Sequence, residues 1–267
     1  MSTFAAMQVV DTHTHLYSED FTTDQELLIN EAIVKGVNRF CLPNIDSSTV
    51  DVMLELVRKY PSNCFPMMGL HPTSVKENYK DELEIVEKRL SEKKFIAVGE
   101  IGIDLYWDKT FLKEQQDAFR RQIEIANHYK LPVSIHSRES FEEIYEILIK
   151  TKKESPFGAF HCFTGTAEQA QRAIDLGFVL GVGGVVTFKN GGVAETIAGI
   201  DLQHLVLETD APYLPPVPFR GKRNVPVYIL KVVEKIAEIK NITVEEVAAI
   251  TTATANKIFS FESYNGN

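Results

Sequence analysis

The feature that most constrains the fold is an alternation of short apolar segments with longer amphipathic ones, repeated eight times along the chain. The short segments are rich in β-branched residues. The segments between them carry apolar residues at i, i+3, i+4 and i+7, which is typical of helices that bury one face. We expect strands at 8–15, 37–43, 64–71, 95–103, 132–136, 158–163, 178–183 and 205–210. Strands that are separated by helices in this way form a parallel sheet with covered faces.

Eight such units in 267 residues predict an α/β fold of the (β/α)₈, or TIM-type, barrel class. The seventh helix should be short, because the segment 184–200 is rich in glycine. Two helical patterns, at 227–241 and 243–260, follow the last strand and predict the eighth helix and an extra C-terminal helix. No linker divides the chain, so we expect one domain over 1–267 with a ragged N-terminus at 1–6.

An open doubly wound sheet is the alternative fold. The first expected strand is followed by HTHLYSEDF, which contains no G-x-G-x-x-G turn, and this absence disfavours a dinucleotide-binding fold. Capping patterns support individual helix starts. Ser140 precedes FEEIYEIL with Glu143 three residues later, and Thr166 precedes AEQA with Gln169 at the same spacing.

Charge and cysteine content limit the functional classes. The net charge of −9 opposes any general attraction to nucleic acid or to an anionic membrane, so a polyanionic substrate would need a local positive centre. Cys41, Cys64 and Cys162 are odd in number and widely spaced, which indicates neither a disulfide framework nor a metal knuckle. The chain shows no signal-peptide pattern and no apolar run long enough to span a membrane. We expect a cytoplasmic protein, a monomer, with no membrane association and no stable protein partner.

Ionisable residues gather at or near the carboxyl ends of the expected strands. In a TIM-type barrel these ends share one face, which carries the active site. We therefore expect the following residues to converge on one pocket: His13, His15, His71, Glu100, His136, His161 and Asp210.

Two motifs in this set point to metal binding. His13 and His15 form His-x-His in an expected strand, where the period of two places both imidazoles on one side. Glu100 lies in the apolar segment IAVGEIGID, where a carboxylate is rarely buried unless it is paired or binds a cation. We expect Gly99 and Gly102 to leave room for a metal or substrate.

Six of these residues make a full ligand set for two divalent cations: His13, His15, Glu100, His136, His161 and Asp210. Four neutral imidazoles and two carboxylates contribute −2 and two cations +4, so the centre keeps a charge of about +2 that attracts phosphate oxygens. Metal-assisted hydrolysis is the implied reaction class. Histidine and carboxylate suit Zn²⁺, Mn²⁺, Co²⁺ and Mg²⁺ alike.

The remaining candidates would contact the substrate. His71 lies at the expected mouth of the pocket. Arg138 and Arg223 lie where they could reach phosphates, and Tyr106 and Trp107 follow the fourth strand and could stack on a base. Each of these residues could equally have a packing or solvated surface role. Cys162 should point away from the pocket, because it alternates with His161.

The ordered motifs DTHTHL, GLHP, VGEIGIDLYW, PVSIHSRES, GAFHCFTG and LVLETDAPYLPP resemble those of the TatD-related deoxyribonuclease family, which belongs to the amidohydrolase-like metal barrels. The resemblance spans nearly the whole chain. It implies a divalent-metal-dependent hydrolase of DNA phosphodiester bonds, often a 3′ to 5′ exonuclease that prefers single strands.

The resemblance also implies individual roles. His13, His15 and Asp210 match the ligands of one metal, Glu100 matches the bridging ligand, and two further histidines match the second site, namely His136 and His161. Glu100 and Asp210 are thus the expected catalytic residues, with Asp210 orienting or deprotonating the attacking water. His71 matches a histidine near the substrate phosphate.

One departure from the family pattern is Val225, which stands in RGKRNVP where a glutamate is usual; it leaves every expected ligand intact. Two other functions remain open from the sequence. The same barrel and metals could hydrolyse a small amide, a lactone or an aminoacyl ester, because fold and metals do not fix the substrate. A non-catalytic scaffold is the third possibility, and the complete ligand set argues against it.

Overall fold

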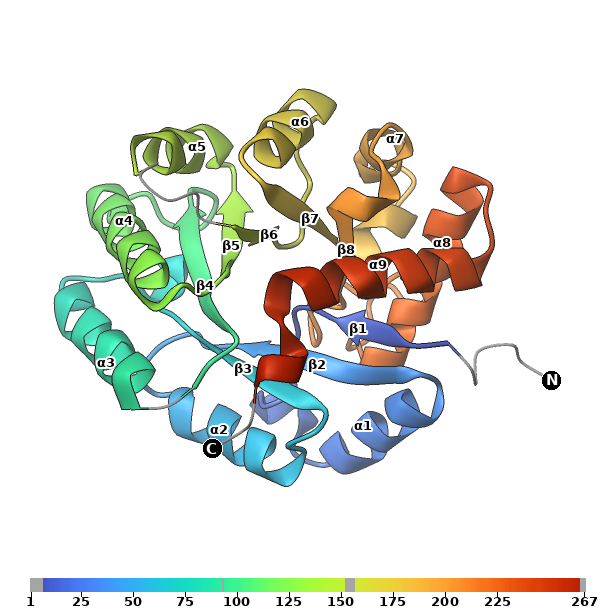
Figure 1. The fold of residues 1–267 in the computed structure, drawn as a ribbon, viewed down its shortest axis with the longest axis horizontal. Helices are drawn as coiled ribbons and strands as arrows, with labels where there is room; N and C mark the ends of the chain where they lie inside the picture. The colour runs from blue at the N-terminus through green and yellow to red at the C-terminus, as the bar shows by residue number, and fades with distance from the viewer. Residues whose placement is uncertain (1–6, 93, 152–156, 265–267) are drawn as a thin grey trace.

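Eight strands form one parallel sheet in chain order in the computed structural model, which describes residues 7–92, 94–151 and 157–264 (Figure 1). Each strand pairs in parallel with the next. The strands are β1 (Val9–Asp11), β2 (Val37–Pro43), β3 (Cys64–Met68), β4 (Ala97–Asp104), β5 (Val133–Arg138), β6 (Gly158–Phe160), β7 (Phe178–Val182) and β8 (Leu205–Leu207). Residues 1–6, for which the sequence predicted a ragged N-terminus, lie outside the described residues.

Backbone hydrogen bonds close this sheet into a barrel. The Thr12 N–H, just beyond β1, donates to the carbonyl of Leu207 at the end of β8 (2.9 Å). The Asp210 N–H in turn donates to the His13 carbonyl (2.9 Å). The first and last strands are therefore neighbours, and the (β/α)₈ barrel expected from the sequence is confirmed.

Helices surround the barrel because α1 to α8 bury apolar side chains against the outer face of the strands, while α9 lies across one end (Figure 1). They are α1 (Gln25–Val34), α2 (Val50–Lys59), α3 (Tyr79–Glu92), α4 (Leu112–Tyr129), α5 (Phe141–Lys150), α6 (Ala167–Asp175), α7 (Val193–Ala198), α8 (Ile229–Lys240) and α9 (Val244–Phe259). As expected from its glycine-rich segment, α7 is short, and the 3₁₀ helix η4 (Gly184–Thr187) precedes it. The other 3₁₀ helices are η2 (Glu19–Phe21), η3 (Pro72–Ser74), η5 (Leu202–His204), η6 (Pro226–Tyr228) and η7 (Phe261–Ser263).

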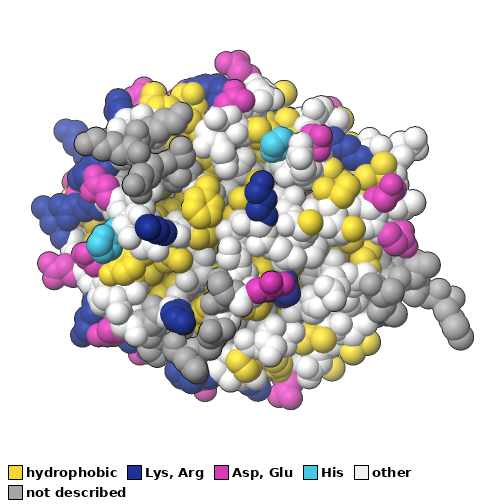
Figure 2. Space-filling view, viewed as in Figure 1, with side chains coloured by type: hydrophobic (Ala, Val, Ile, Leu, Met, Phe, Trp, Pro, Cys, Tyr) yellow, Lys and Arg dark blue, Asp and Glu magenta, His cyan; other side chains and the backbone are white. Residues whose placement is uncertain are grey.

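The extra C-terminal helix α9 covers the amino-terminal end of the barrel (Figure 1). The Thr252 hydroxyl donates to the carbonyl of Gln8, just before β1. Ala255 and Phe259 pack on inward-facing side chains of the strands such as Val10 and Phe65. Acidic, basic and hydrophobic side chains are interspersed over this face (Figure 2). Because α9 closes this end, the opposite, carboxyl-terminal end remains for the site.

The two predicted helix caps have different outcomes. Thr166 and Gln169 form a reciprocal capping box at the start of α6, as predicted. Ser140 precedes α5, but the prediction that its side chain caps this helix is wrong. Its hydroxyl instead donates to the Ile103 carbonyl in β4, so the side chain links the α5 start to the barrel.

The helices and the cysteines can be compared with the expectations of no membrane association and no disulfide framework. None of the helices within the described ranges is long and apolar enough to cross a membrane. The three cysteines are free thiols, with Cys41 and Cys64 buried in the core.

Candidate metal centre

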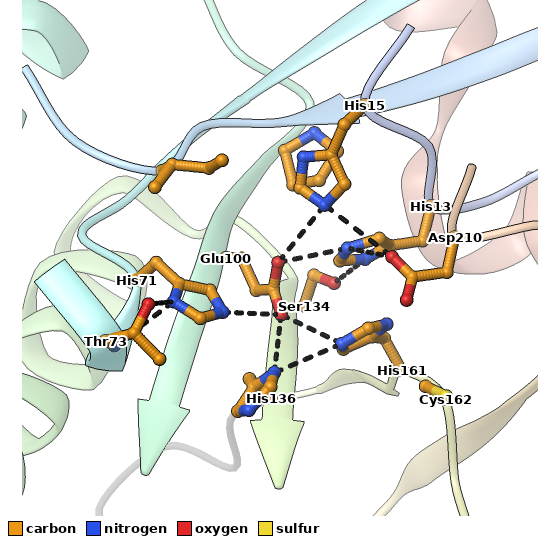
Figure 3. A network of polar contacts seen from close by, with 12 residues as sticks. His13, His15, His71, Thr73, Glu100, Ser134, His136, His161, Cys162 and Asp210 are labelled. Carbon is orange, nitrogen blue, oxygen red and sulfur yellow. Dashed lines mark hydrogen bonds and ion pairs between the residues drawn. The ribbon is translucent and has the colours of Figure 1, made fainter. Parts of the chain in front are cut away.

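The expected ionisable residues converge at the carboxyl-terminal end of the barrel, around the carboxylate of Glu100 (Figure 3). A cavity of about 690 Å³ opens there, with Glu100, His136 and Asp210 in its wall. Three groups of side chains each bring their ligand atoms within 4.8 Å of one another: His13, Glu100 and His161; His13, His15 and Asp210; His71, Glu100 and His136. The convergence of these residues that the sequence predicted is therefore observed.

His13 and His15 reach the cluster from a loop, and their expected alternation along a strand is wrong. The strand β1 ends at Asp11, whose buried side chain accepts hydrogen bonds from the Thr209 N–H (2.9 Å) and hydroxyl (2.6 Å). Both imidazoles still face the cluster, with ring centroids 5.2 Å apart. His71, His161 and Asp210 likewise lie just beyond their shortened strands.

Asp210 completes this part of the cluster from the end of β8. Its Oδ1 lies 3.6 Å from Nε2 of His15 and 4.0 Å from Nε2 of His13. The backbone of Asp210 is left-handed, with φ +54°, which turns the carboxylate toward the loop after β1. The expected neighbourhood of Asp210 with His13 and His15 is confirmed.

Glu100 faces the interior because β4 changes its alternation. Ala97 belongs to the inner cluster of the barrel, whereas Val98, Ile101 and Ile103 all belong to the outer one. A strict period of two cannot place Val98 and Ile101 on the same face. The register of β4 against β5 shifts between Val98 and Ile101, and this irregularity turns Glu100 inward.

The glycines beside Glu100 serve the sheet, so the expectation that they leave room for metal or substrate is wrong. A Cβ at Gly102, whose φ is +150°, would lie 1.9 Å from the His136 carbonyl oxygen. A Cβ at Gly99 would lie 2.8 Å from Cβ of Ser134. Both glycines allow β5 to approach β4 closely, and this approach brings His136 to Glu100.

Glu100 is the acceptor at the centre of the cluster. Its Oε1 lies 2.8 Å from Nδ1 of His136 and 2.8 Å from Nε2 of His161, and its Oε2 lies 3.1 Å from Nε2 of His13. Burial alone would raise the pKa of Glu100, but the surrounding imidazoles, His161 foremost, outweigh burial and hold the pKa well below 4.5. Glu100 is therefore an anion that shares its two oxygens among several nitrogen ligands.

Burial shifts the pKa values of His13, His15 and Asp210 toward their neutral forms, whereas at His136 and His161 the neighbouring carboxylates outweigh burial and raise the pKa of both rings. Burial lowers the pKa of His13 to about 4 and that of His15 to about 3. Burial also raises the pKa of Asp210 to about 7, with the negative charge of Glu100 adding to the effect. Neutral imidazole is the form that binds a metal, so His13 and His15 are suited to be ligands near neutral pH.

Two of the histidines, His15 and His136, each form a hydrogen bond on the side of the ring that faces away from the cluster. This bond determines whether the nitrogen that faces the cluster carries a lone pair or a proton. The Tyr17 hydroxyl donates to the Pro43 carbonyl, so Nδ1 of His15 must donate to the Tyr17 oxygen (3.1 Å), which leaves Nε2 as an acceptor. When His136 is neutral, it donates its Nε2–H to the Asp104 carboxylate (2.8 Å), which leaves Nδ1 as the acceptor that faces Glu100.

The facing ring nitrogens and carboxylates of the cluster can accommodate a cation. On the inner side of the cluster, the lone pairs of His15 and His136 face the carboxylates of Asp210 and Glu100, and an acceptor cannot bond to an acceptor without a proton or metal ion between them. Imidazole nitrogen and carboxylate oxygen are also the donors that divalent transition metals prefer. The residues present therefore fit divalent metal ions.

His71 differs from the other histidines in its outward partner. It precedes η3, and its Nδ1 accepts a hydrogen bond from the Thr73 N–H (3.1 Å). A neutral His71 therefore carries its proton on Nε2, which faces Glu100 at 3.3 Å. The ring presents a hydrogen-bond donor to the cluster, whereas His15 and His136 present acceptors.

The expected aromatic and basic residues divide between the cavity and other surfaces. The Arg138 guanidinium lies over the Tyr106 ring, 3.9 Å from its centroid, and Trp107 and Arg138 both line the cavity. Tyr106 and Trp107 are 51% and 69% exposed. Arg223 instead forms an ion pair with Asp24 and donates a hydrogen bond to the Asp20 carbonyl. It is not among the described residues of the cavity wall.

Cys162 contributes to the cavity wall, so the expectation that it points away is wrong. The strand β6 ends at Phe160, and Cys162 has φ +44°. Strand alternation from His161 to Cys162 therefore does not apply.

Three polar residues that the sequence reasoning missed support the cluster: Asp104, Glu208 and Ser134. Asp104 accepts from His136 and from the Trp107 N–H, Glu208 lies behind His161, and the Ser134 hydroxyl lies 3.1 Å from Nδ1 of His13. Spacing could have indicated one of them, because Asp104 lies four residues after Glu100 in β4, at an interval that shares a strand face.

Fold and site together define a metal-dependent hydrolase barrel, with imidazoles and carboxylates at the carboxyl ends of its strands. The sequence profile of the TatD related DNase family matches residues 10–260. The chain belongs to this family.

Relatives cover nearly the whole chain. An uncharacterized metal-dependent hydrolase, YabD of Bacillus subtilis, is 38% identical over 93% of this chain and 98% of its own length. The uncharacterized metal-dependent hydrolase YcfH of Escherichia coli K12 is 32% identical over 96% and 97%. The crystal structure of YJJV, a TatD homologue from Escherichia coli K12, superposes with a TM-score of 0.89 at 30% identity, covering 94% of this chain and 98% of that one.

Proposed function

We propose that this metal-dependent hydrolase cleaves phosphodiester bonds of DNA, as a 3′ to 5′ exodeoxyribonuclease that prefers single strands. The observation that carries the proposal is the convergence of ring nitrogens of His15 and His136 with the carboxylates of Glu100 and Asp210 at an open cavity, a set of groups that fits divalent cations. Membership of the TatD related DNase family supports DNA as the substrate.

Six side chains would hold two divalent cations. His13, His15 and Asp210 would bind one ion and His136 and His161 the other, with Glu100 shared between the two. When bound, such ions supply a nucleophilic water near neutral pH and stabilise the charge that develops on phosphate oxygens. The geometry of the cluster supports the sharing, because Oε2 of Glu100 faces His13 and His15 while Oε1 faces His136 and His161.

The other groups of the cavity would orient the substrate. His71 points its Nε2–H into the cluster and would donate to a phosphate oxygen. The Asp210 carboxylate, in the cavity wall, would orient the attacking water and accept its proton. Arg138 is the one arginine or lysine among the described residues of the wall, and it would pair with a phosphate of the DNA chain.

The exposed rings of Tyr106 and Trp107 would give unpaired bases a surface for stacking. Unstacked bases are available in a single strand and not in a duplex, so this surface favours single-stranded substrates. Arg223 would contribute at most through a more distant phosphate, since Asp24 neutralises its guanidinium.

Digestion of end-labelled single-stranded DNA tests the proposal. The metal-stripped protein would receive Mg²⁺, Mn²⁺ or Zn²⁺ separately, with Glu100→Ala as the control for contaminating nuclease. We expect stepwise shortening from the 3′ end that requires both metal and Glu100. No cleavage by protein that demonstrably binds metal would refute the nuclease and favour hydrolysis of a small amide, lactone or aminoacyl ester on the same barrel.

Location and assembly complete the proposal. We propose a cytoplasmic monomer, in keeping with three free thiols in the described chain. Light scattering coupled to size-exclusion chromatography should give a mass near 30.1 kDa, and twice that mass would refute the monomer.

A further inference from the structure

The Glu208 carboxylate lies directly behind His161, on the side of the ring that faces away from Glu100. Glu208 follows β8 and is 1% exposed. Its Oε1 accepts a hydrogen bond from the Cys162 N–H (2.6 Å) and lies 3.6 Å from Nδ1 of His161. On the other side of the ring, Nε2 of His161 faces Glu100 at 2.8 Å.

Two buried polar atoms at this place have no hydrogen-bond partner. They are Nδ1 of His161 and Oε2 of Glu208, and they belong to the few such side-chain atoms in the part of the chain that the structure describes. A buried polar atom without a partner is destabilising, and a charged group without one is more so. One is a ring nitrogen able to donate and the other a carboxylate oxygen able only to accept, on two side chains that already approach each other.

The backbone of β7 leaves space for this carboxylate. A Cβ at Gly181 would lie 2.3 Å from Oε2 of Glu208 and 3.0 Å from Cα of His161. Any side chain at position 181 would therefore displace Glu208 or the His161 backbone. The glycine keeps the acid and the histidine together.

We propose that Glu208 is a positioning residue for the metal centre: it accepts the Nδ1–H of His161 and so directs the Nε2 lone pair of that ring toward the cations. The inference rests on the proposed metal ligation by His161. Asp104 holds His136 in the same way, and Tyr17 holds His15. A carboxylate behind a ligating imidazole fixes the tautomer and the ring orientation and makes the ring a better ligand.

A purely structural role for Glu208 makes a different prediction. If the side chain only anchors the Cys162 N–H, then Glu208→Gln keeps the acceptor oxygen and leaves metal binding unchanged. If it orients His161, the same variant weakens Zn²⁺ binding at one of two sites by about 10–100-fold. The matched control is Glu246→Gln, since Glu246 also accepts a backbone N–H, that of Thr243 (2.9 Å), but lies on α9 at the other end of the barrel.

Calorimetric titration of the metal-stripped full chain with Zn²⁺ alone measures this difference, together with Glu208→Asp as the conservative variant. We expect two ions in wild type and in Glu246→Gln, one weakened site in Glu208→Gln and partial recovery in Glu208→Asp. Equal affinities in Glu208→Gln and wild type would overturn the inference. Wild-type protein that binds no Zn²⁺ would overturn the metal centre and this inference with it.

A measurement on the wild-type chain covers the case in which the variants fail to fold. Long-range ¹H–¹⁵N correlation spectra of the Zn²⁺-loaded protein distinguish a protonated from a metal-bound ring nitrogen. We expect His161 to carry its proton on Nδ1, and a proton on Nε2 would overturn the inference. Neither experiment uses DNA, so a failure of the nuclease proposal alone leaves both results unaffected.

Discussion

Replacement of Glu100 by glutamine should change the response of the protein to metal more than its fold. Glutamine keeps the size of the side chain but loses the charge and one of its two acceptor oxygens. In the metal-free wild type those oxygens lie within 3.1 Å of ring nitrogens of His13, His136 and His161, and a proton between the two atoms makes each contact a hydrogen bond to a charged acceptor. The variant therefore weakens three contacts at once and removes the ligand that both proposed cation sites share.

The loss of stability in Glu100→Gln can be estimated from these contacts. A hydrogen bond to a charged group contributes about 1.5–3 kcal/mol and a neutral one about 0.5–1.5 kcal/mol, so three contacts lose roughly 3 kcal/mol together. The lower desolvation penalty of the neutral amide offsets part of this loss. We expect the metal-free variant to be less stable by about 1–3 kcal/mol. Bound Zn²⁺ at 100 times its Kd adds about 2.7 kcal/mol to the wild type, which raises Tm by roughly 5–10 °C in a chain of this size.

Thermal unfolding in chelator and in Zn²⁺ separates the two effects. We expect the wild type to gain the full shift on zinc addition and Glu100→Gln to gain less than about 2 °C. The control is Glu142→Gln, which breaks the exposed ion pair with Arg172 on the outer helices and should respond to zinc like the wild type. A zinc-induced shift in Glu100→Gln equal to that of the wild type would refute the bridging role of Glu100.

Three further predictions concern base stacking on Trp107, the role of His71 as a hydrogen-bond donor and the ion pairs of Asp117 on α4. Trp107→Ala should raise KM for single-stranded DNA by about 5–100-fold with little change in kcat, because a stacked base contributes about 1–3 kcal/mol; an unchanged KM would rule out stacking on this ring. His71→Ala should lower kcat while elemental analysis still finds two metals per chain, and loss of a metal would show that His71 is a ligand instead of a donor. Partial burial alone would raise the pKa of Asp117, but hydrogen bonds from Arg120 and Tyr79 outweigh it and lower the pKa below 3.8. Because the folded pKa is the lower one, the stabilisation is present above about pH 4 and disappears as the pH falls through the folded value. Asp117→Asn should therefore lose about 1 kcal/mol in urea unfolding at pH 7 and less at pH 3, and an equal loss at both values would count against the ion pairs.

The position of the site was predictable because it depends only on topology. Eight apolar segments alternating with helices indicate a barrel, and the carboxyl ends of parallel strands share one face. His136 on β5 and Asp210 after β8 were therefore expected together although 74 residues separate them in the chain, since 210 − 136 is 74. No knowledge of side-chain direction was needed for this step.

Side-chain directions were less predictable because local irregularities set them. Glu100 turns inward only because β4 shifts its register beside Gly99, and no pattern in IAVGEIGID marks that shift. The loop that carries His13 and His15 follows Asp11, whose side chain is bound by Thr209, a contact between residues 198 positions apart. Periodicity within a segment does not reveal such long-range contacts.

The supporting residues were missed for a related reason. Asp104 and Glu208 look like ordinary acids in the sequence, and their importance arises from the ring nitrogens of His136 and His161 that they face. The role of Gly102 was misassigned similarly, because the group that occupies the space above it is the His136 backbone of the neighbouring strand.

The two-cation site around Glu100 can be tested directly by anomalous diffraction. Crystals grown with Zn²⁺ or Mn²⁺ would be measured at the absorption edge of the metal. We expect two anomalous peaks per chain, one among His13, His15 and Asp210 and one beside His136 and His161, with Glu100 contacting both. Peaks bound by other residues, or no peak at this end of the barrel, would contradict the two-cation site.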